Sequence, residues 1–160
     1  MKTETVNYQA TGVELEGYVA FPDADNAPLV LIAHTWAGKD EFVHQKAEDL
    51  AALGYVGFAV DMYGNGKVGA DTAENESLMT PLVSDRAMLK DRIVSALNYG
   101  KNLSGVDSNK TAAIGYCFGG LVALDLARSG EDLRGVVSFH GLLMPSDISE
   151  KGIQAKVLVL

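Results

Sequence analysis

Residues 115–119 read Gly-Tyr-Cys-Phe-Gly, a stretch that places one cysteine between two glycines. An apolar, strand-like run ending at Ala113-Ile114 precedes it, and a helical pattern starting near Leu121 follows. Strand, sharp turn and helix is the context of the nucleophile elbow, whose central side chain sits at the tip of a strained turn and whose neighbours must be small. The stretch therefore predicts that Cys117, the only cysteine of the chain, is a nucleophile at such a turn.

Runs of apolar and alternating residues predict the strands around this turn. Thr5 to Thr11 and Val13 to Phe21 alternate apolar and polar residues, as an antiparallel hairpin with one exposed face does. Continuous apolar runs are typical of parallel strands that are covered on both faces. The remaining strand-like stretches are Leu29 to Ala33, Tyr55 to Val60, Thr111 to Tyr116, Val136 to Phe139 and Lys156 to Leu160.

Three helices are expected between these strands. The first has Asp40 as its N-cap and ends near Gly54, which suits a C-cap, and the third spans Leu121 to Arg128. For the second, Thr80-Pro81 has the pattern of an N-cap followed by a first helical residue. The buried face of this helix, about five turns long, is marked by Leu82, Leu89, Ile93 and Leu97.

Two segments without a clean period are expected to be loops, namely Gly64 to Met79 and Met144 to Gln154. Strands that alternate with helices after an antiparallel start predict an α/β fold of three layers with a mostly parallel central sheet. We expect a single domain over residues 1–160. Because the last predicted strand ends with the chain at Leu160, we expect this domain to be incomplete at its C-terminus, without the loop that follows the strand.

The composition argues against several classes of partner. A net charge of −8 without a run of Lys or Arg argues against nucleic acid or an anionic membrane. The N-terminus opens directly into a strand-like pattern, and no apolar run approaches the length of a membrane span. One cysteine cannot form an internal disulfide, which suits a reducing compartment. We therefore expect a soluble, cytoplasmic protein that acts on a small molecule, and the sequence leaves its oligomeric state open.

The chemistry of an elbow needs more than the thiol. A thiol becomes a good nucleophile once it is ionised, which a helix N-terminus and a nearby histidine both promote. Attack on a carbonyl carbon also requires donors aimed at the developing oxyanion. One donor is the backbone N–H of the residue after the nucleophile, here Phe118, and the second comes from the loop after the third strand. In that loop, residues 34–38, we choose the N–H of Trp36.

Each candidate residue also has a structural interpretation. A lone cysteine such as Cys117 can be a small buried hydrophobic residue, although its glycine neighbours favour the elbow. His34 ends a strand and can be a hydrogen-bonded edge residue, a support for the oxyanion loop or part of a pocket. His140 also ends a strand and is a weaker candidate for a base, which Asp147 could orient. His44 lies within a predicted helix and is expected to be solvated.

The remaining polar candidates have simpler interpretations. Asp61 ends a strand and is expected to cap the turn that follows it. Asp71, Glu74 and Glu76 are expected to form a solvated loop, with a lid over the pocket as the alternative. No cluster of His, Cys, Asp and Glu has the spacing of metal ligands, and no glycine pattern fits a phosphate loop. We therefore expect neither a metal nor a cofactor.

The chain resembles the dienelactone hydrolase family over essentially its whole length. The most specific segment is Gly-Tyr-Cys-Phe-Gly-Gly. The similar segments, in chain order, are residues 31–38, 59–64, 114–120, 137–141 and 156–160. The resemblance implies an α/β-hydrolase fold without a large cap domain, and hydrolysis of a lactone or ester through a thioester acyl-enzyme. It also implies a Cys-His-Asp triad with Cys117 as nucleophile, and the N–H groups of Trp36 and Phe118 as oxyanion donors.

The chain departs from the family's pattern at three places. By the resemblance, the Asp of the triad follows the strand at residues 156–160 and the His lies further on, so both fall beyond Leu160. Thr35 stands where many members carry a Glu that contacts the thiol. Asn65 stands near the place of an Arg that binds a substrate carboxylate in members that cleave dienelactone.

These observations leave more than one hypothesis for the function. The leading one is a dienelactone hydrolase-like enzyme that cleaves a lactone or small carboxylic ester through Cys117. A variant of it completes the triad within the chain, with His140 and Asp147. The alternative is a catalytically silent truncated or regulatory module, in which Cys117 is a reactive or redox-sensing thiol.

Overall fold

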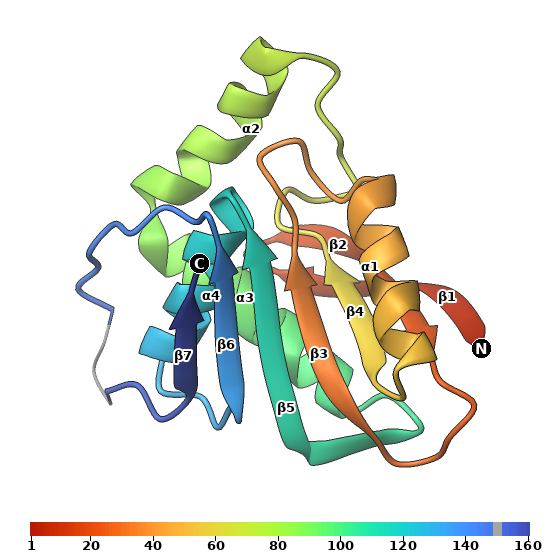
Figure 1. The fold of residues 1–160 in the computed structure, drawn as a ribbon. Coiled ribbons are helices and arrows are strands. Elements are labelled where there is room, and N and C mark those ends of the chain that lie inside the picture. The colour runs from red at the N-terminus through yellow and green to blue at the C-terminus, as the bar shows by residue number, and fades with distance from the viewer. Residues whose placement is uncertain (149–151) are drawn as a thin grey trace.

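The computed structural model describes residues 1–148 and 152–160, which form one seven-stranded sheet with helices on both faces (Figure 1). The strands are β1 (Lys2–Ala10), β2 (Val13–Phe21), β3 (Ala27–Ala33), β4 (Val56–Val60), β5 (Val106–Tyr116), β6 (Gly135–Phe139) and β7 (Lys156–Val159). The helices are α1 (Glu41–Ala52), α2 (Thr72–Ser84), α3 (Arg86–Lys101) and α4 (Phe118–Arg128). Their positions place the strand-to-helix turn of the elbow between β5 and α4.

The sheet is mostly parallel, with the strand order β1-β2-β4-β3-β5-β6-β7. β1 and β2 form the expected antiparallel hairpin, and β2 also lies antiparallel to β4. From β4 to β7 every neighbouring pair is parallel. α1 covers one face of the sheet, whereas α3 and α4 cover the other (Figure 1). The predicted three-layer α/β architecture is therefore confirmed.

Neighbouring residues of the central strands enter two different cores. In β3, Leu31 packs in the core under α3 and α4, whereas Ile32 packs in the smaller core under α1. Both side chains are fully buried, and this burial on two faces explains why the strand is a continuous apolar run. In β4, Gly57 lets α1 come close, because a Cβ there would lie 2.4 Å from the carbonyl oxygen of Ala47.

The segment Gly64 to Met79 is not the loop that its sequence predicts, since α2 occupies its second half. The side chain of Asp71 caps this helix and accepts a hydrogen bond from the N–H of Glu74 at 2.9 Å. Pro81 lies inside α2 and is not the first residue of a helix. Because α2 buries only Leu82, it has no apolar stripe along its length, and the usual periodic signal of a helix is missing.

Asp85 divides the expected five-turn helix into the end of α2 and the start of α3. Its N–H donates to the carbonyl oxygen of Pro81 at 3.0 Å, which closes α2. Its carboxylate accepts from the N–H of Met88 at 2.9 Å, which caps α3. A short polar residue that bonds to the backbone on both sides favours such a break.

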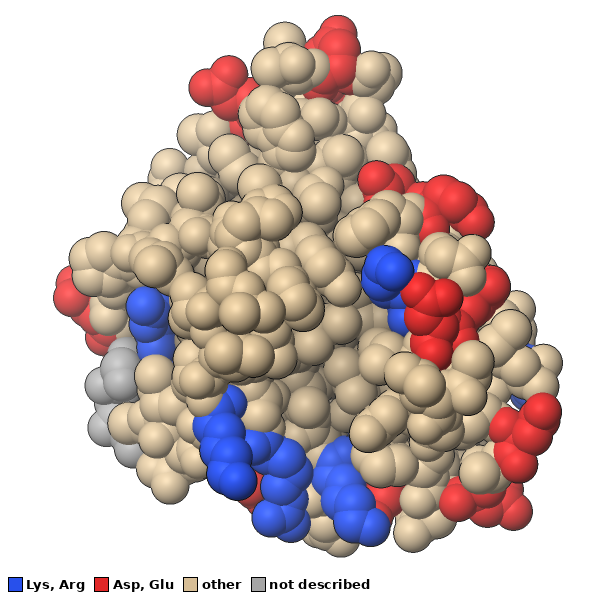
Figure 2. Space-filling model, in the orientation of Figure 1, with Lys and Arg blue, Asp and Glu red and all other residues tan. Residues whose placement is uncertain are grey.

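α1 covers only part of its face of the sheet. No other helix of the described residues lies on the rest of that face (Figure 1). Ile114, Val137 and Leu158 are neighbours in register across β5, β6 and β7 and point to this face. Leu158 is 51% exposed. Figure 2 shows the same side, with most charged side chains toward its periphery. The middle of this face is therefore formed mainly by uncharged side chains.

Candidate active site

The elbow has the conformation that its sequence predicts. β5 ends at Tyr116, α4 begins at Phe118, and Cys117 between them has φ 56° and ψ −115°. A positive φ is a strained conformation for a residue other than glycine. It is held from both sides, since the N–H of Cys117 donates to the carbonyl oxygen of Phe139 and its own carbonyl oxygen accepts from the N–H of Gly120, each at 3.0 Å. Cys117 is a free, half-buried thiol.

The glycines around Cys117 are required by close backbone contacts. A Cβ at Gly115 would lie 1.8 Å from the carbonyl oxygen of Gly119. A Cβ at Gly119 would lie 2.1 Å from the carbonyl oxygen of Ala33, at the end of β3. The start of α4 is thus pressed against both β5 and β3, and side chains at either glycine would push it away.

Both candidate oxyanion donors are backbone N–H groups near this contact. Phe118 is the first residue of α4, so its N–H has no acceptor within the helix. Trp36 lies in the loop after β3, in a turn that Thr35 closes by accepting from the N–H of Ala37 at its Oγ1 (3.2 Å) and from the N–H of Gly38 at its carbonyl oxygen (3.2 Å). Among the described residues, no atom accepts a hydrogen bond from the N–H of Trp36.

His34 supports this loop from a fully buried position. Its Nε2 accepts from the N–H of Met62 at 3.1 Å, and its Nδ1 donates to the carbonyl oxygen of Thr35 at 2.6 Å. Because Nε2 accepts and Nδ1 donates, the imidazole is neutral. Burial lowers the pKa of His34, which also favours the neutral form. Because the Thr35 carbonyl and the Trp36 N–H belong to one trans peptide and point in opposite directions, His34 also orients the donor. The hydrogen-bonded interpretation of His34 is confirmed, and its bond to Thr35 holds the loop of Trp36.

Tyr63 contacts both halves of the candidate site. Its hydroxyl donates to the carbonyl oxygen of Trp36 at 2.7 Å. Its ring stacks on Phe118, with 5.9 Å between the centroids, and meets the ring of His34 at 4.7 Å. Burial raises the pKa of Tyr63 strongly, and the negative charge of a Cys117 thiolate raises it further. The local sequence around Tyr63 gives no signal of these contacts, because the residues that it touches lie far away along the chain.

Asp61 caps the turn that follows it and contains Tyr63, as predicted. Its buried carboxylate accepts from the N–H groups of Tyr63 at 2.8 Å, Gly64 at 2.9 Å and Gly66 at 2.9 Å. From α3, the guanidinium of Arg92 donates to the carbonyl oxygens of Met62 at 2.7 Å and Tyr63 at 3.3 Å. Arg92 was missed, since a charged residue on a helix normally indicates its exposed face. The segment that carries Tyr63 is therefore held on both sides.

The other candidate residues do not join Cys117. His140 is exposed, and its N–H donates to the carbonyl oxygen of Leu160 at 2.7 Å. Asp147 is exposed as well. Within residues 1–148 and 152–160, no hydrogen bond links either side chain to Cys117 or to the other, so the variant with a triad inside the chain does not form. Elsewhere, His44 is not simply solvated, because its ring stacks on Tyr18 with 4.3 Å between the centroids.

Of the exposed acids, Asp71 caps the N-terminus of α2, and Glu74 and Glu76 lie within its first turns and not in a loop. α2 extends beyond the carboxyl ends of the parallel strands, the same edge at which Cys117 lies (Figure 1). Trp36 is half-buried, and its side chain packs against the main core. These positions put polar α2 near the candidate site without placing any of its acids on Cys117.

A buried cluster of three charged residues, which the sequence did not reveal, holds the C-terminal half of α4. The carboxylate of Asp125 is fully buried and accepts two hydrogen bonds from Arg86, at 2.6 and 2.7 Å, and one from Arg128, at 2.9 Å. Arg86 opens α3 and also donates to the carbonyl oxygens of Met144 at 3.4 Å and Pro145 at 3.3 Å. These hydrogen bonds therefore connect α3, α4 and the segment after β6.

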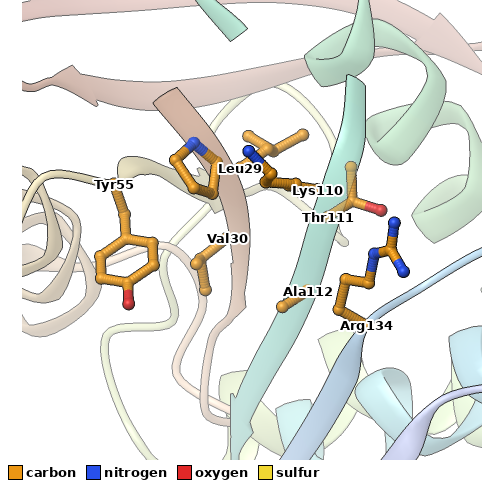
Figure 3. Close-up of a pocket in the computed structure, with 8 residues that line it drawn as sticks. Leu29, Val30, Tyr55, Lys110, Thr111, Ala112 and Arg134 are labelled. Carbon is orange, nitrogen blue, oxygen red and sulfur yellow. The ribbon is translucent and has the colours of Figure 1, made fainter. Parts of the chain in front are cut away.

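A cavity of about 320 Å³ lies away from the elbow (Figure 3). Its lining residues are Pro28, Leu29, Val30, Tyr55, Lys110, Thr111, Ala112 and Arg134. They surround the amino-terminal ends of β3, β4 and β6, whereas Cys117 follows the carboxyl end of β5. In the described ranges, no group of three or more His, Cys, Asp and Glu residues could hold a metal ion, and no helix is long and apolar enough to cross a membrane.

The sequence of this chain is similar to a known protein family and to several of its members. Residues 15–160 match the model of the dienelactone hydrolase family. A putative carboxymethylenebutenolidase of Aquifex aeolicus is 27% identical over 162 residues, which cover 98% of this chain and 69% of the relative. A probable 2-oxo-3-(5-oxofuran-2-ylidene)propanoate lactonase of Bradyrhizobium is 28% identical, over 89% of this chain and 60% of the relative.

The fold is also similar to solved structures. One named m3DLH superposes with a TM-score of 0.94 at 32% identity, over 99% of this chain and 67% of that one. The dienelactone hydrolase-like promiscuous phosphotriesterase P91 from metagenomic libraries has a TM-score of 0.93 at 33% identity, again over 99% and 67%. With an α/β-hydrolase fold, the elbow turn and a family match over most of its length, the chain belongs to the dienelactone hydrolase family.

Proposed function

We propose that this chain carries the nucleophile and the oxyanion hole of a hydrolase for lactones or small carboxylic esters. The observation that supports the proposal most is the strained backbone of Cys117 at the junction of β5 and α4. That conformation puts the thiol at the edge where the parallel strands end, which is where α/β sheets bind ligands. Membership of the family supports the reaction class.

In the proposed reaction, the Cys117 thiolate attacks the carbonyl carbon of the ester, and the carbonyl oxygen takes up the negative charge. The N–H groups of Trp36 and Phe118 stabilise this charge by donating hydrogen bonds to the oxygen, which is the largest single contribution in many acyl transfers. The carbon–oxygen bond to the leaving group then breaks, the alkoxide takes a proton from water and departs as the alcohol, and a thioester on Cys117 remains. Water hydrolyses the thioester in a second step.

The second step needs a base, and the resemblance places the Asp and His of the triad beyond Leu160. The described residues contain no histidine that is hydrogen-bonded to the Cys117 thiol. We therefore expect this chain to become acylated by an activated ester and to release the acyl group slowly. Loss of a triad member lowers turnover by orders of magnitude, as in subtilisin.

Acylation by p-nitrophenyl acetate tests this proposal. The chain should release one burst of p-nitrophenolate and gain one acetyl group in its intact mass, because Cys117 is its single cysteine. Cys117→Ala should show neither, while circular dichroism shows an unchanged fold. Equal acetylation of the wild type and Cys117→Ala would remove Cys117 as the nucleophile.

A silent or regulatory module with a reactive thiol is the second candidate. It is favoured by the positions of His140 and Asp147, which are exposed and form no hydrogen bond with Cys117. Steady turnover of the ester by this chain would contradict it. Treatment with dilute peroxide tests the redox-sensing form, in which Cys117 becomes a sulfenic acid; a thiol inert to peroxide would exclude that form.

A further inference from the structure

The side chain of Tyr63 links the two backbone segments that supply the candidate oxyanion donors. Its hydroxyl donates to the carbonyl oxygen of Trp36, on the loop after β3, at 2.7 Å. Its ring lies on that of Phe118, at the start of α4, with an interplanar angle of 20°. We propose that Tyr63 is a positioning residue that holds the N–H groups of Trp36 and Phe118 in place for acyl transfer. This inference rests on the function proposed above.

The backbone geometry explains why the hydroxyl of Tyr63 matters for Trp36. Two planar peptide units meet at the Cα of Trp36. The first, which carries the donor N–H, is held through the Thr35 carbonyl by Nδ1 of His34 at 2.6 Å. The second is held through the Trp36 carbonyl by Tyr63. With both units held, the dihedral angles of Trp36 are fixed, and so is the direction of its N–H.

The support for this hydrogen bond is rigid. Tyr63 is 7% exposed, and its backbone N–H bonds to the carboxylate of Asp61 at 2.8 Å. Arg92 bonds to the Tyr63 carbonyl oxygen at 3.3 Å. Because burial raises the pKa of Tyr63 above the ordinary tyrosine value, its hydroxyl remains a protonated donor at neutral pH. The hydroxyl therefore acts as a fixed hydrogen-bond donor through the reaction.

Two reactions of the same thiol separate positioning from general packing. Acylation by p-nitrophenyl acetate builds negative charge on a carbonyl oxygen and depends on the oxyanion donors. Alkylation by iodoacetamide joins the sulfur to the CH₂ carbon as iodide leaves, and no oxyanion forms. A loss of donor alignment should slow the first reaction alone, whereas a change in the ionisation or exposure of Cys117 should affect both.

The test variant is Tyr63→Phe, which keeps the ring and removes the hydroxyl. Its acylation rate constant is expected to fall about tenfold, since a misaligned donor is less damaging than a deleted one. Its alkylation rate constant should remain within about twofold of the wild type. Trp36 is the single tryptophan, and acrylamide should quench its fluorescence more in the variant because the loop is less restrained.

Tyr8→Phe is the matched control. Tyr8 is also 7% exposed and buried in the sheet, and its hydroxyl makes no hydrogen bond to the loop of Trp36 or to Phe118 in the described residues. This variant should acylate like the wild type. Should Tyr63→Phe not fold, Tyr63→Met offers a second variant, because a flexible thioether fills irregular space in cores; it should show the same selective loss of acylation.

The outcomes separate this inference from the proposed function. Acylation of Tyr63→Phe at the wild-type rate overturns the positioning role and leaves Cys117 as the nucleophile. An equal fall in acylation and alkylation also overturns it, since Tyr63 would then act on the thiol or on the fold. Failure of the wild type to acylate at Cys117 would instead reject the proposed function itself.

Discussion

Replacing Gly115 by alanine tests how strictly the elbow depends on the contact between β5 and α4. A Cβ at Gly115 would lie 1.8 Å from the carbonyl oxygen of Gly119 and 2.8 Å from the nitrogen of Gly120. Contacts of a Cβ shorter than 3.0 Å are essentially not observed, so the first turn of α4 must move by more than about 1 Å. Overpacking costs about 1–3 kcal/mol, and the upper end applies because the contacted atoms are backbone. With a urea m-value of about 2 kcal/mol/M, the unfolding midpoint should fall by about 1.5 M.

Gly135→Ala is the matched control for this prediction. Gly135 opens β6, and a Cβ there meets only the carbonyl oxygen of Lys156, at an ordinary 3.7 Å. Its midpoint should stay the same or rise slightly, because alanine lowers the entropy of the unfolded chain. Urea unfolding followed by the fluorescence of Trp36 measures both variants. Equal midpoints for Gly115→Ala and Gly135→Ala would refute the argument that the elbow glycine is required by contact.

The buried charges of the fold give two more expectations, both measured by urea unfolding. Asp125→Ala leaves Arg86 without its charged partner and should lower the free energy of unfolding by about 3–5 kcal/mol, whereas Asp49→Ala at an exposed ion pair of α1 should have no measurable effect. Burial holds the pKa of His34 below that of the unfolded chain, so the unfolded state binds the extra proton and stability should fall as the pH drops below about 6.5. His34→Gln should flatten this dependence more than His44→Gln, since His44 is less buried; equal slopes would contradict the assignment.

The parts of the fold that could be predicted are those whose burial leaves a simple pattern in the sequence. Leu29 to Ala33 is covered on both faces and is therefore apolar throughout, which identifies a central parallel strand. α2 could not be predicted in this way, because it extends from the body of the fold and buries only Leu82. Its start depends on a local cap at Asp71, which a polar segment with several acids does not distinguish from others.

The candidate site likewise combines a feature that the local sequence predicts with contacts between distant residues that it does not predict. The elbow is made by consecutive residues, so one short segment predicts both the turn and the position of Cys117. The support of the oxyanion loop instead comes from contacts across the fold, as when the hydroxyl of Tyr63 reaches the carbonyl of Trp36. Arg92 lies on the inner face of α3, where a charged residue interrupts the apolar pattern, and its hydrogen bonds to the carbonyls of Met62 and Tyr63 and to the hydroxyl of Thr11 explain it. The turn that carries the candidate nucleophile can thus be predicted from spacing alone, whereas the contacts that hold the loop of Trp36 become visible only when the chain is folded.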